Sequence, residues 1–215
     1  RTQNTPTFSE NVCVVLVRPE HDGNIGAVAR SMLNFGIYDL RVVGRSGDWS
    51  EEARRRAKNA QQVLDSAKIV DTIEESVSDC SLVVGTSGKR EEGEKTVRRH
   101  FLLPDELPKR LSEHEGRVAI VFGPEGKGLL NEQLSMCDLL VTIPTWEGYP
   151  ILNLSHAVSI ICFSWFVNSE TAQISGTGGR LLNPKLRDKL RSEAKRLVES
   201  MPTKEHKRKG KEDTL

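Results

Sequence analysis

Short apolar runs alternate with segments of helical periodicity along most of the chain. The runs are rich in β-branched residues and almost uninterrupted by polar ones, which is typical of strands covered on both faces of a sheet. They predict six strands, at residues 11–17, 40–43, 68–71, 81–85, 117–122 and 139–143. Strands that alternate with helices predict an α/β fold with a mostly parallel sheet and flanking helices.

The segments between these runs place apolar residues three or four positions apart, as an amphipathic helix does. The clearest pattern covers residues 24–35, and Gly36 is expected to end that helix. Ser50 is a candidate N-cap for a helix that starts at residue 51. Further helices are predicted at 73–78, 104–111, 131–136 and 152–167.

The pattern also divides the chain into a body and an extension. Residues 1–168 contain all the predicted strands and are expected to form one α/β domain. A segment rich in Gly, Ser and Thr follows at 169–182 and predicts a flexible linker. Residues 183–215 predict a basic amphipathic helix that reaches about residue 199 and then a disordered tail.

The overall charge hides an asymmetry between these two parts. The 215 residues carry 31 Lys+Arg against 30 Asp+Glu, a net charge of +1, which argues against a uniformly basic nucleic-acid-binding domain. Residues 180–215 hold twelve basic and six acidic residues, however, so a +6 tail follows a −5 body. The tail is therefore the part expected to meet an acidic partner.

Several features concern the cell compartment. No apolar run approaches the roughly 20 residues that cross a bilayer, so we expect no membrane span. The polar first ten residues predict no secretory signal. The four cysteines, Cys13, Cys80, Cys137 and Cys162, are widely spaced and form no C-x-x-C pair. We therefore expect reduced thiols, no structural metal and a cytoplasmic protein.

The first candidate site is the segment G-N-I-G-A-V-A-R at 23–30, which follows a predicted strand and opens a helix. Backbone N–H groups at a helix start favour an anion. The third glycine of a dinucleotide-binding fingerprint is missing, so that motif is weak here. Asn24 can be explained as a helix cap, and a lone Arg30 on a helix is usually only solvated.

The second candidate is F-G-P-E-G-K-G at 122–128. It resembles a phosphate-binding P-loop only superficially, because Lys127 is followed by Gly128 and not by the hydroxyl residue that holds magnesium. Its three glycines require a tight turn or a close approach to a ligand. Glu125 inside this turn favours a ligand that is not a polyphosphate.

The third candidate runs from Trp146 to His156 and leads into the most apolar predicted helix. Asn153 and Ser155 stand at its start, where one of them is easily explained as a cap. His156 is expected to pack or to form a hydrogen bond. Because ligands of open α/β sheets bind at the carboxyl ends of strands, the three loops predict a small-molecule site whose chemistry stays open.

Taken together, the segments N-I-G-A-V-A-R at 24–30, F-G-P-E-G-K-G-L at 122–129 and I-L-N-L-S-H-A at 151–157 resemble the three motifs of the SPOUT superfamily of RNA methyltransferases. They are similar to its TrmH/TrmJ branch, which methylates ribose 2′-hydroxyl groups. The resemblance spans about residues 11–167. The stretch P-T-W-E-G-Y-P and the helical extension make archaeal TrmJ enzymes the most similar group.

This resemblance implies a deep trefoil knot in the C-terminal half of the domain, one of the rare exceptions to unknotted topology. It also implies S-adenosylmethionine as cofactor and a homodimer in which the catalytic arginine of one subunit completes the other subunit's site. The implied activity is 2′-O-methylation of a tRNA ribose, at nucleotide 32 of the anticodon loop. The alternatives are methylation of ribosomal RNA and a non-catalytic RNA-binding protein on the same fold.

The resemblance also implies roles for individual residues. Arg30 would bind the phosphate beside the target ribose and stabilise the developing alkoxide, because its pKa is too high for a general base. Asn24 would orient Arg30 or the ribose, and Glu125 would hold Arg30 or nearby backbone donors. Ile151 replaces the serine found two residues before Asn153 in the family.

The residues carried over fall into three groups. The implied catalytic residues are Asn24, Arg30, Glu125 and Asn153. The implied cofactor-binding residues are Thr86, Ser87, Gly88, Gly123, Glu125, Gly126, Ile143, Pro144, Leu152, Asn153, Leu154 and Ala157. Basic clusters expected to contact tRNA phosphates, together with the tail, contain Arg54, Arg55, Lys89, Arg90, Arg98 and Arg99.

Overall fold

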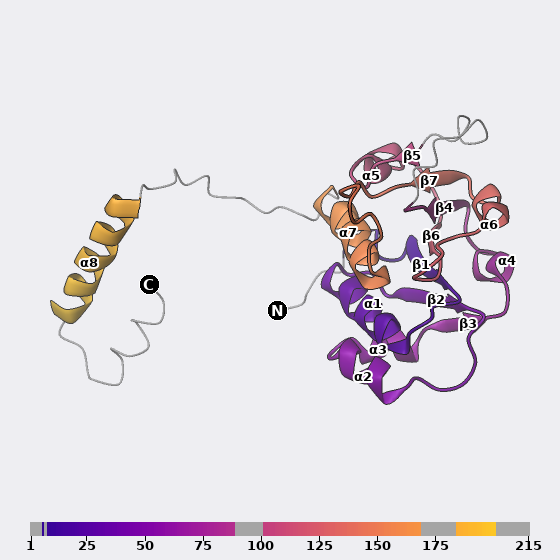
Figure 1. Cartoon of the computed structure of the whole chain (residues 1–215), viewed down its shortest axis with the longest axis horizontal. Helices are drawn as coiled ribbons and strands as arrows, with labels where there is room; N and C mark the ends of the chain where they lie inside the picture. The colour runs from indigo at the N-terminus through magenta and orange to yellow at the C-terminus, as the bar shows by residue number, and fades with distance from the viewer. Residues whose placement is uncertain (1–5, 7, 89–100, 169–183, 201–215) are drawn as a thin grey trace. The chain divides into compact units, whose positions relative to one another are not determined.

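The computed structural model describes residues 6, 8–88, 101–168 and 184–200 (Figure 1). Seven strands form one sheet in the order β3-β2-β1-β6-β4-β7-β5, and every pair of neighbours is parallel. The strands are β1 (Val12–Val17), β2 (Asp39–Val43), β3 (Lys68–Val70), β4 (Leu82–Thr86), β5 (Phe101–Leu102), β6 (Val118–Phe122) and β7 (Leu139–Val141). The predicted α/β fold with a parallel sheet is confirmed.

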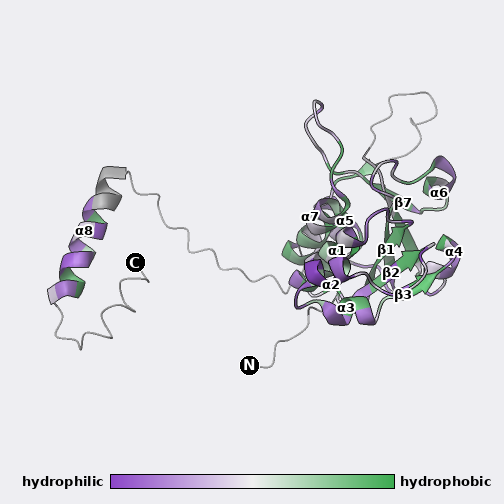
Figure 2. Cartoon of the chain, turned by 60° about the horizontal axis from the view of Figure 1, so that its bottom comes forward, coloured by the Kyte–Doolittle hydropathy of each residue, from purple (hydrophilic) through white to green (hydrophobic). Residues whose placement is uncertain are grey.

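Helices cover both faces of the sheet. Apolar side chains of α1, α2, α3, α5 and α7 pack on one face, and those of α4 and α6 pack on the other. Figure 2 shows the hydrophobic strands at the centre of the body and hydrophilic positions on its outer helices. The bounds are α1 (Asp22–Asn34), α2 (Glu51–Ala57), α3 (Gln61–Asp65), α4 (Ile73–Ser76), α5 (Glu106–Arg110), α6 (Asn131–Ser135) and α7 (Leu154–Val167).

Strand β1 shows why its sequence is apolar throughout. Val14 and Leu16 belong to the core under α1 and α7, whereas Cys13 and Val15 face the opposite core. All four side chains are fully buried. A strand with helices over both faces cannot alternate between apolar and polar residues, because neither of its faces meets water.

Helix α1 packs against α2 at very short range. A Cβ atom added to Gly26 would lie 2.0 Å from the backbone oxygen of Ala53, closer than any real side chain could come. Gly26 therefore allows the two helix backbones to meet.

The structure corrects several predicted elements. Helix α1 begins at Asp22 with His21 as its cap, so Asn24 is not a cap but a buried residue inside the helix. The helix predicted to start at residue 51 ends at Ala57, where Lys58 adopts a positive φ of 52°, and α3 follows as a separate helix. The two-residue strand β5 was not predicted. The expected cap at Ser50 and the helix stop at Gly36, with φ of 72°, are confirmed.

A buried ion-pair network lies at the amino ends of the strands. Arg41 is only 2% exposed, and its guanidinium contacts the carboxylates of Asp39, at 2.6 Å, and Asp79. Arg117 pairs with the same two carboxylates, at 3.1 and 2.9 Å. Hydrogen bonds from Arg41 are the main reason why the pKa of Asp79 lies well below its ordinary value. Every charge in this network has an opposite charge beside it.

All four cysteines are free thiols. Cys13 is buried on β1, and its sulfur lies 3.6 Å from the sulfur of Cys80 at the edge of the Arg41 network. Burial raises the pKa of Cys162, inside α7, to about 12. In the described part of the chain, no helix combines the length and the apolar character that crossing a membrane requires.

Helix α8 (Pro184–Ser200) matches the predicted basic helix and forms a unit of its own. Leu190 and Leu197 on this helix are 59% and 60% exposed. The predicted linker at 169–182 and the predicted tail beyond residue 200 lie outside the described residues, and the predicted domain boundaries remain predictions.

Candidate functional site

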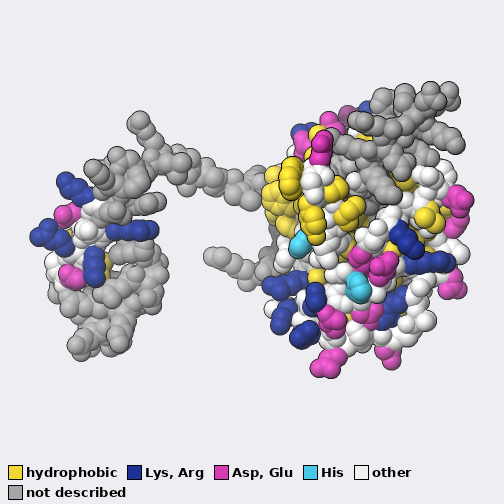
Figure 3. All heavy atoms as spheres, in the orientation of Figure 1, with side chains coloured by type: hydrophobic (Ala, Val, Ile, Leu, Met, Phe, Trp, Pro, Cys, Tyr) yellow, Lys and Arg dark blue, Asp and Glu magenta, His cyan; other side chains and the backbone are white. Residues whose placement is uncertain are grey.

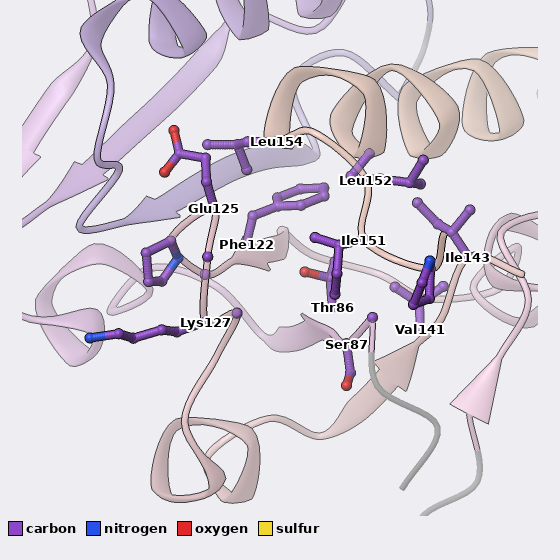
Figure 4. Close-up of a pocket in the computed structure, with 17 residues that line it drawn as sticks. Thr86, Ser87, Phe122, Glu125, Lys127, Val141, Ile143, Ile151, Leu152 and Leu154 are labelled. Carbon is purple, nitrogen blue, oxygen red and sulfur yellow. The ribbon is translucent and has the colours of Figure 1, made fainter. Parts of the chain in front are cut away.

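A pocket opens at the carboxyl ends of the neighbouring strands β6, β4 and β7 (Figure 4). Its empty volume is about 740 Å³, which includes space open to solvent. Because the strands are parallel, the loops that follow them meet at one edge of the sheet, as the sequence predicted. The pocket is lined by Thr86, Ser87, Gly88, Phe122, Gly123, Pro124, Glu125, Gly126, Lys127, Gly128, Val141, Ile143, Pro150, Ile151, Leu152, Leu154 and Ala157.

Ten of the twelve residues expected to bind the cofactor line this pocket, and Pro144 and Asn153 do not. Asn153 is instead the N-cap of α7, where its side chain accepts a hydrogen bond from the backbone N–H of Ser155. Seven further lining residues were not among those expected to bind the cofactor. Six of them belong to the candidate segments 122–128 and 146–156, and only Val141, in the predicted strand at 139–143, lies outside them. The seven are Phe122, Pro124, Lys127, Gly128, Val141, Pro150 and Ile151.

The loop after β6 needs its glycines for steric reasons. A Cβ atom added to Gly123 would lie 2.2 Å from the backbone of Gly128, so the two ends of the loop touch through their main chains. Gly128 has a positive φ of 67°, and its N–H donates to the carbonyl oxygen of Pro124 at 2.9 Å. The result is a closed turn that holds Glu125 at a fixed place.

A chain of hydrogen bonds joins the three candidate segments. Glu125 accepts from the side-chain amide of Asn24 at 2.7 Å and from the backbone N–H of Glu20 at 2.8 Å. The amide of Asn153 donates to the oxygen of Asn24 at 3.2 Å. Three of the four residues expected to be catalytic are therefore in direct contact, although up to 129 positions separate them in the sequence.

Glu125 is held in its ionised form. Partial burial by itself raises the pKa of this carboxyl, but hydrogen bonds from Asn24 and from backbone N–H groups of Glu20 and His21 outweigh that effect. The pKa of Glu125 therefore lies below its ordinary value. No cation supplies this shift; neutral donors do.

Arg30 lies apart from the pocket. It lines a separate, open hollow between α1 and α2, and in the described part of the chain its guanidinium has no hydrogen bond or ion pair. The contact between Glu125 and Arg30 that we considered is thus not found among these residues. Figure 3 shows Lys and Arg side chains gathered over α1 and α2. The hollow is lined by Ala27, Arg30, Ser31, Asn34, Arg55, Arg56 and Lys58.

The candidate RNA contacts are only partly described. Arg55 lines the hollow beside Arg30, whereas Arg54 turns toward Asp65 and forms an ion pair of 2.5 Å. Arg56, from the same basic cluster, lines the same hollow and pairs with Glu52 at 2.7 Å. The other four candidates, Lys89, Arg90, Arg98 and Arg99, lie outside the described residues.

The interior of the pocket is mainly apolar. Figure 4 shows Phe122, Ile143 and Leu152 around its centre, while the charged ends of Glu125 and Lys127 point away from it. Such a lining suits a flat apolar group, and the exposed main chain of the glycine loop can bind the polar ends of the same ligand. Among the residues described, no three His, Cys, Asp or Glu side chains are grouped as metal ligands.

Comparisons with known proteins agree with this arrangement. The sequence model of the SpoU rRNA Methylase family matches residues 11–163. The chain is 45% identical over 152 residues to the tRNA (cytidine-2′-O-)-methyltransferase TrmJ of Methanocaldococcus jannaschii, a match that covers 71% of this chain and 66% of that protein. It is 39% identical over 157 residues to the tRNA (cytidine/uridine/adenosine-2′-O-)-methyltransferase TrmJ of Pseudomonas aeruginosa, covering 72% and 60%.

The fold has solved relatives as well. The crystal structure of TrmJ from Z. mobilis ZM4 superimposes with a TM-score of 0.66 and 29% sequence identity, over 87% of this chain and 79% of that one. The chain spans less than two thirds of the length of the two TrmJ sequences it matches.

Proposed function

Because the chain belongs to the SpoU rRNA Methylase family, we propose that it transfers a methyl group from S-adenosylmethionine to a ribose 2′-hydroxyl of RNA. The observation that carries this proposal is the contact between Asn24, Glu125 and Asn153 beside a pocket built from three strand ends. Three separate motifs thus contribute to one site, and each of them is a motif that the family resemblance singled out.

The pocket fits the cofactor that this reaction needs. Its apolar lining suits an adenine ring, and the loops at Thr86–Gly88 and Gly123–Gly126 offer backbone groups for the ribose and the amino-acid end. Bound there, S-adenosylmethionine supplies an electrophilic methyl group. Neither a metal nor a covalent intermediate is required, so the task of the protein is to position two reactants and to assist loss of the hydroxyl proton.

Arg30 is the residue that we assign to the RNA. As a cation without a partner among the described residues, it can bind a phosphate and stabilise negative charge on the 2′-oxygen. Asn24 and Glu125 act together as a positioning pair: the ionised carboxylate fixes the amide of Asn24, and Asn24 lies on the same helix as Arg30. In this proposal Glu125 holds Asn24 and backbone donors and does not hold Arg30.

We further propose tRNA as the substrate and nucleotide 32 of the anticodon loop as the target. The two named relatives, whose printed activities are 2′-O-methylation of tRNA, support the first part of this proposal, and the resemblance to archaeal TrmJ supports the second. Methylation of ribosomal RNA by the same chemistry is the main alternative. The other is a protein that binds RNA on this fold without catalysis.

One assay separates these possibilities. The purified protein is incubated with labelled S-adenosylmethionine and, in separate reactions, with unmodified tRNA and unmodified ribosomal RNA, and the labelled nucleotide is then mapped at single-nucleotide resolution. We expect label at nucleotide 32. Label only in ribosomal RNA would support the main alternative, and RNA binding without label in either RNA would leave the non-catalytic protein.

The position of Arg30 supports a homodimer. Arg30 does not line the cofactor pocket of its own chain, so a complete site needs either a large rearrangement or an arginine from a second subunit. Helix α7 offers a surface for such an assembly, because Phe163 and Val167 are 53% and 42% exposed. Figure 3 shows apolar side chains gathered over this helix.

Subunit mixing tests the shared site. The assay uses S-adenosylmethionine well below its wild-type Kd, where Arg30→Ala should be nearly inactive and Gly123→Ala, with its raised Kd, should keep about a tenth of wild-type activity. When the two are unfolded and refolded together, half of the sites in each mixed dimer contain an intact pocket and an intact arginine. Random pairing of a symmetric dimer should then restore about a quarter of wild-type activity. Absence of recovery, with mixed dimers shown to form, would place the whole site in one subunit.

The basic residues complete the proposal. Arg55 beside Arg30, the clusters at 89–90 and 98–99, and the tail would contact tRNA phosphates. Deleting residues 180–215 should weaken tRNA binding and flatten its salt dependence, because fewer counterions are then released. Loss of the dimer alone would show that the tail is structural. A trefoil knot around the cofactor pocket and a location in the cytoplasm also belong to this proposal.

A further inference from the structure

Two aromatic side chains stand in solvent next to the pocket. Trp146 and Tyr149 are 78% and 79% exposed, the largest exposures among the large apolar side chains of the described residues. Both lie in the loop that connects β7 to α7. Exposed large aromatic side chains are costly for a soluble protein, so a pair of them in one short loop calls for an explanation.

The loop holds its aromatic residues in a defined shape. The hydroxyl of Thr145 donates to the carbonyl oxygen of Pro150 at 3.0 Å, and the N–H of Tyr149 donates to the carbonyl oxygen of Trp146 at 3.0 Å. The indole ring covers Gly148 so closely that an added Cβ atom would lie 2.4 Å from it. The ring of Trp146 therefore lies against its own loop at Gly148.

The base of the loop belongs to the pocket wall. Ile143 lines the pocket just before the loop, and Pro150 and Ile151 line it just after. The loop that contains Trp146 and Tyr149 thus begins and ends at the wall of the pocket.

We propose that Trp146 and Tyr149 form a stacking platform for a nucleobase of the RNA beside the target ribose. This inference rests on the proposed function, which it deepens by assigning residues that hold the substrate. Sequence-tolerant binding of single-stranded RNA relies on aromatic side chains on which bases stack. A platform at the pocket mouth would hold a splayed base and leave its ribose free to enter.

The amount of surface favours a base over a second copy of the chain. Two aromatic side chains can bury roughly 150–250 Å² each, well below the about 800 Å² per partner of a standard protein interface. The exposed apolar residue Phe163 on α7 lies nine positions beyond Leu154, about 13 Å further along that helix. The aromatic loop precedes the start of α7, whereas Phe163 lies toward the other end of that helix.

Tryptophan fluorescence reports on this platform directly. Of the three tryptophans, Trp165 is 7% exposed, and Trp49 is tied to the carbonyl oxygen of Leu64 by a 2.8 Å hydrogen bond. Trp146 is thus the most accessible indole. An RNA stem-loop with the sequence of an anticodon arm should quench the emission of the protein, and the quenching should disappear in Trp146→Phe.

Substitutions then measure the binding. Trp146→Ala and Tyr149→Ala should each raise the Kd for the stem-loop and the KM for tRNA about tenfold, with the Kd for S-adenosylmethionine unchanged. Trp146→Phe and Tyr149→Phe, which keep a ring, should recover most of the affinity. Tyr38→Ala is the matched control, because Tyr38 is 39% exposed and precedes β2 at the opposite edge of the sheet.

The outcomes distinguish this inference from the proposed function. If wild-type protein methylates tRNA and the two alanine variants do so with unchanged KM, the platform is wrong and the function stands. Quenching and weakened RNA binding in a protein that methylates no RNA would keep the platform and remove the function. If the alanine variants sediment as monomers while wild type is a dimer, the loop is a subunit contact and the inference is overturned.

Discussion

Polar residues at the amino ends of the strands are paired with one another, whereas those of the candidate site are open to a ligand. At the amino edge, Arg41 and Arg117 are matched by Asp39 and Asp79, and the central guanidinium is nearly inaccessible to water. At the carboxyl ends of the strands the pocket is open. Arg30 lies apart from this pocket, in the hollow between α1 and α2, and has no partner among the described residues.

The paired charges at the amino ends of the strands therefore serve the stability of the fold, and the polar residues of the candidate site serve function. Charges that are already paired cannot bind a ligand without breaking existing contacts, so the amino-edge network serves the folded state. Polar groups of the candidate site are either held in place, as Asn24 is, or kept free, as Arg30 is. A substitution in one of these two regions should therefore leave the property governed by the other region almost unchanged.

The largest effect on stability is expected at the amino edge. Arg41→Ala removes a fully buried side chain and its charge-assisted hydrogen bonds to Asp39 and Asp79, which Arg117 still contacts, and should lower the free energy of unfolding by about 2–4 kcal/mol. Methyl transfer per folded molecule should stay near the wild-type level. Urea unfolding and activity at low temperature measure the two properties. Lys68→Ala is the control: this exposed lysine, 4.0 Å from Asp79, should contribute less than about 1 kcal/mol.

In the candidate site, a substitution should lower activity and leave the free energy of unfolding unchanged, the reverse of the Arg41 variant. Arg30→Ala removes a cation that stabilises developing charge and should lower kcat about 10²- to 10³-fold. Unfolding free energy and the Kd for S-adenosylmethionine should not change, since the side chain is exposed and lies outside the pocket. Single-turnover kinetics and calorimetry test this. Arg110→Ala, an exposed arginine on α5, is the control, and normal turnover by the Arg30 variant would remove its assigned role.

Gly123 and Gly88 both line the pocket, but alanine substitutions at the two positions should differ in their effect, by less than the effects described above. An added methyl group at Gly123 collides with backbone atoms, whereas one at Gly88 meets nothing within 4 Å. Gly123→Ala should cost about 1–3 kcal/mol of stability and raise the cofactor Kd about tenfold, because the loop must open to admit the methyl group. Gly88→Ala should change both quantities little. Equal effects of the two substitutions would show that the loop after β6 is not a rigid cradle.

The smallest effect concerns pH. The pKa values of Asp79 and Glu125 both lie below their ordinary values, so each carboxylate stabilises the fold above its unfolded-state pKa, and the contribution is lost as the pH falls through the folded-state pKa. The causes differ: the Arg41 cation lowers the pKa of Asp79, and neutral hydrogen-bond donors lower that of Glu125. Added salt should therefore raise the pKa of Asp79 and leave that of Glu125 nearly constant. Carboxyl NMR titrations at low and high salt measure this, and an equal response would contradict the assigned causes.

Much of the sheet could be predicted because its strands are covered on both faces. Runs such as 12–17 contain almost only apolar residues, and no helix with a solvent-facing side has that composition. Strand β5 could not be predicted, because its two residues are too short to show a period. The end of α2 at Ala57 could not be predicted either, because lysine is not a residue type that commonly adopts a positive φ.

The site could be predicted only in part. The resemblance identified Asn24, Glu125 and Asn153, but the hydrogen bonds between them depend on which loops meet in space. Ile151 had been noted only as a replacement for a serine, and the structure places it in the pocket wall. The buried role of Arg41 had one weak sequence signal, the aspartate two residues earlier, on the same face of the strand.

The contact between Gly26 and Ala53 has a consequence for the spacing of the two arginines proposed to contact RNA. With no side chain between the two helix backbones, α2 cannot slide or tilt on α1 without a collision. Arg30 follows Gly26 by one helical turn, and Arg55 follows Ala53 by two residues. The close packing of α1 on α2 at Gly26 therefore fixes the spacing between the backbone positions of Arg30 and Arg55.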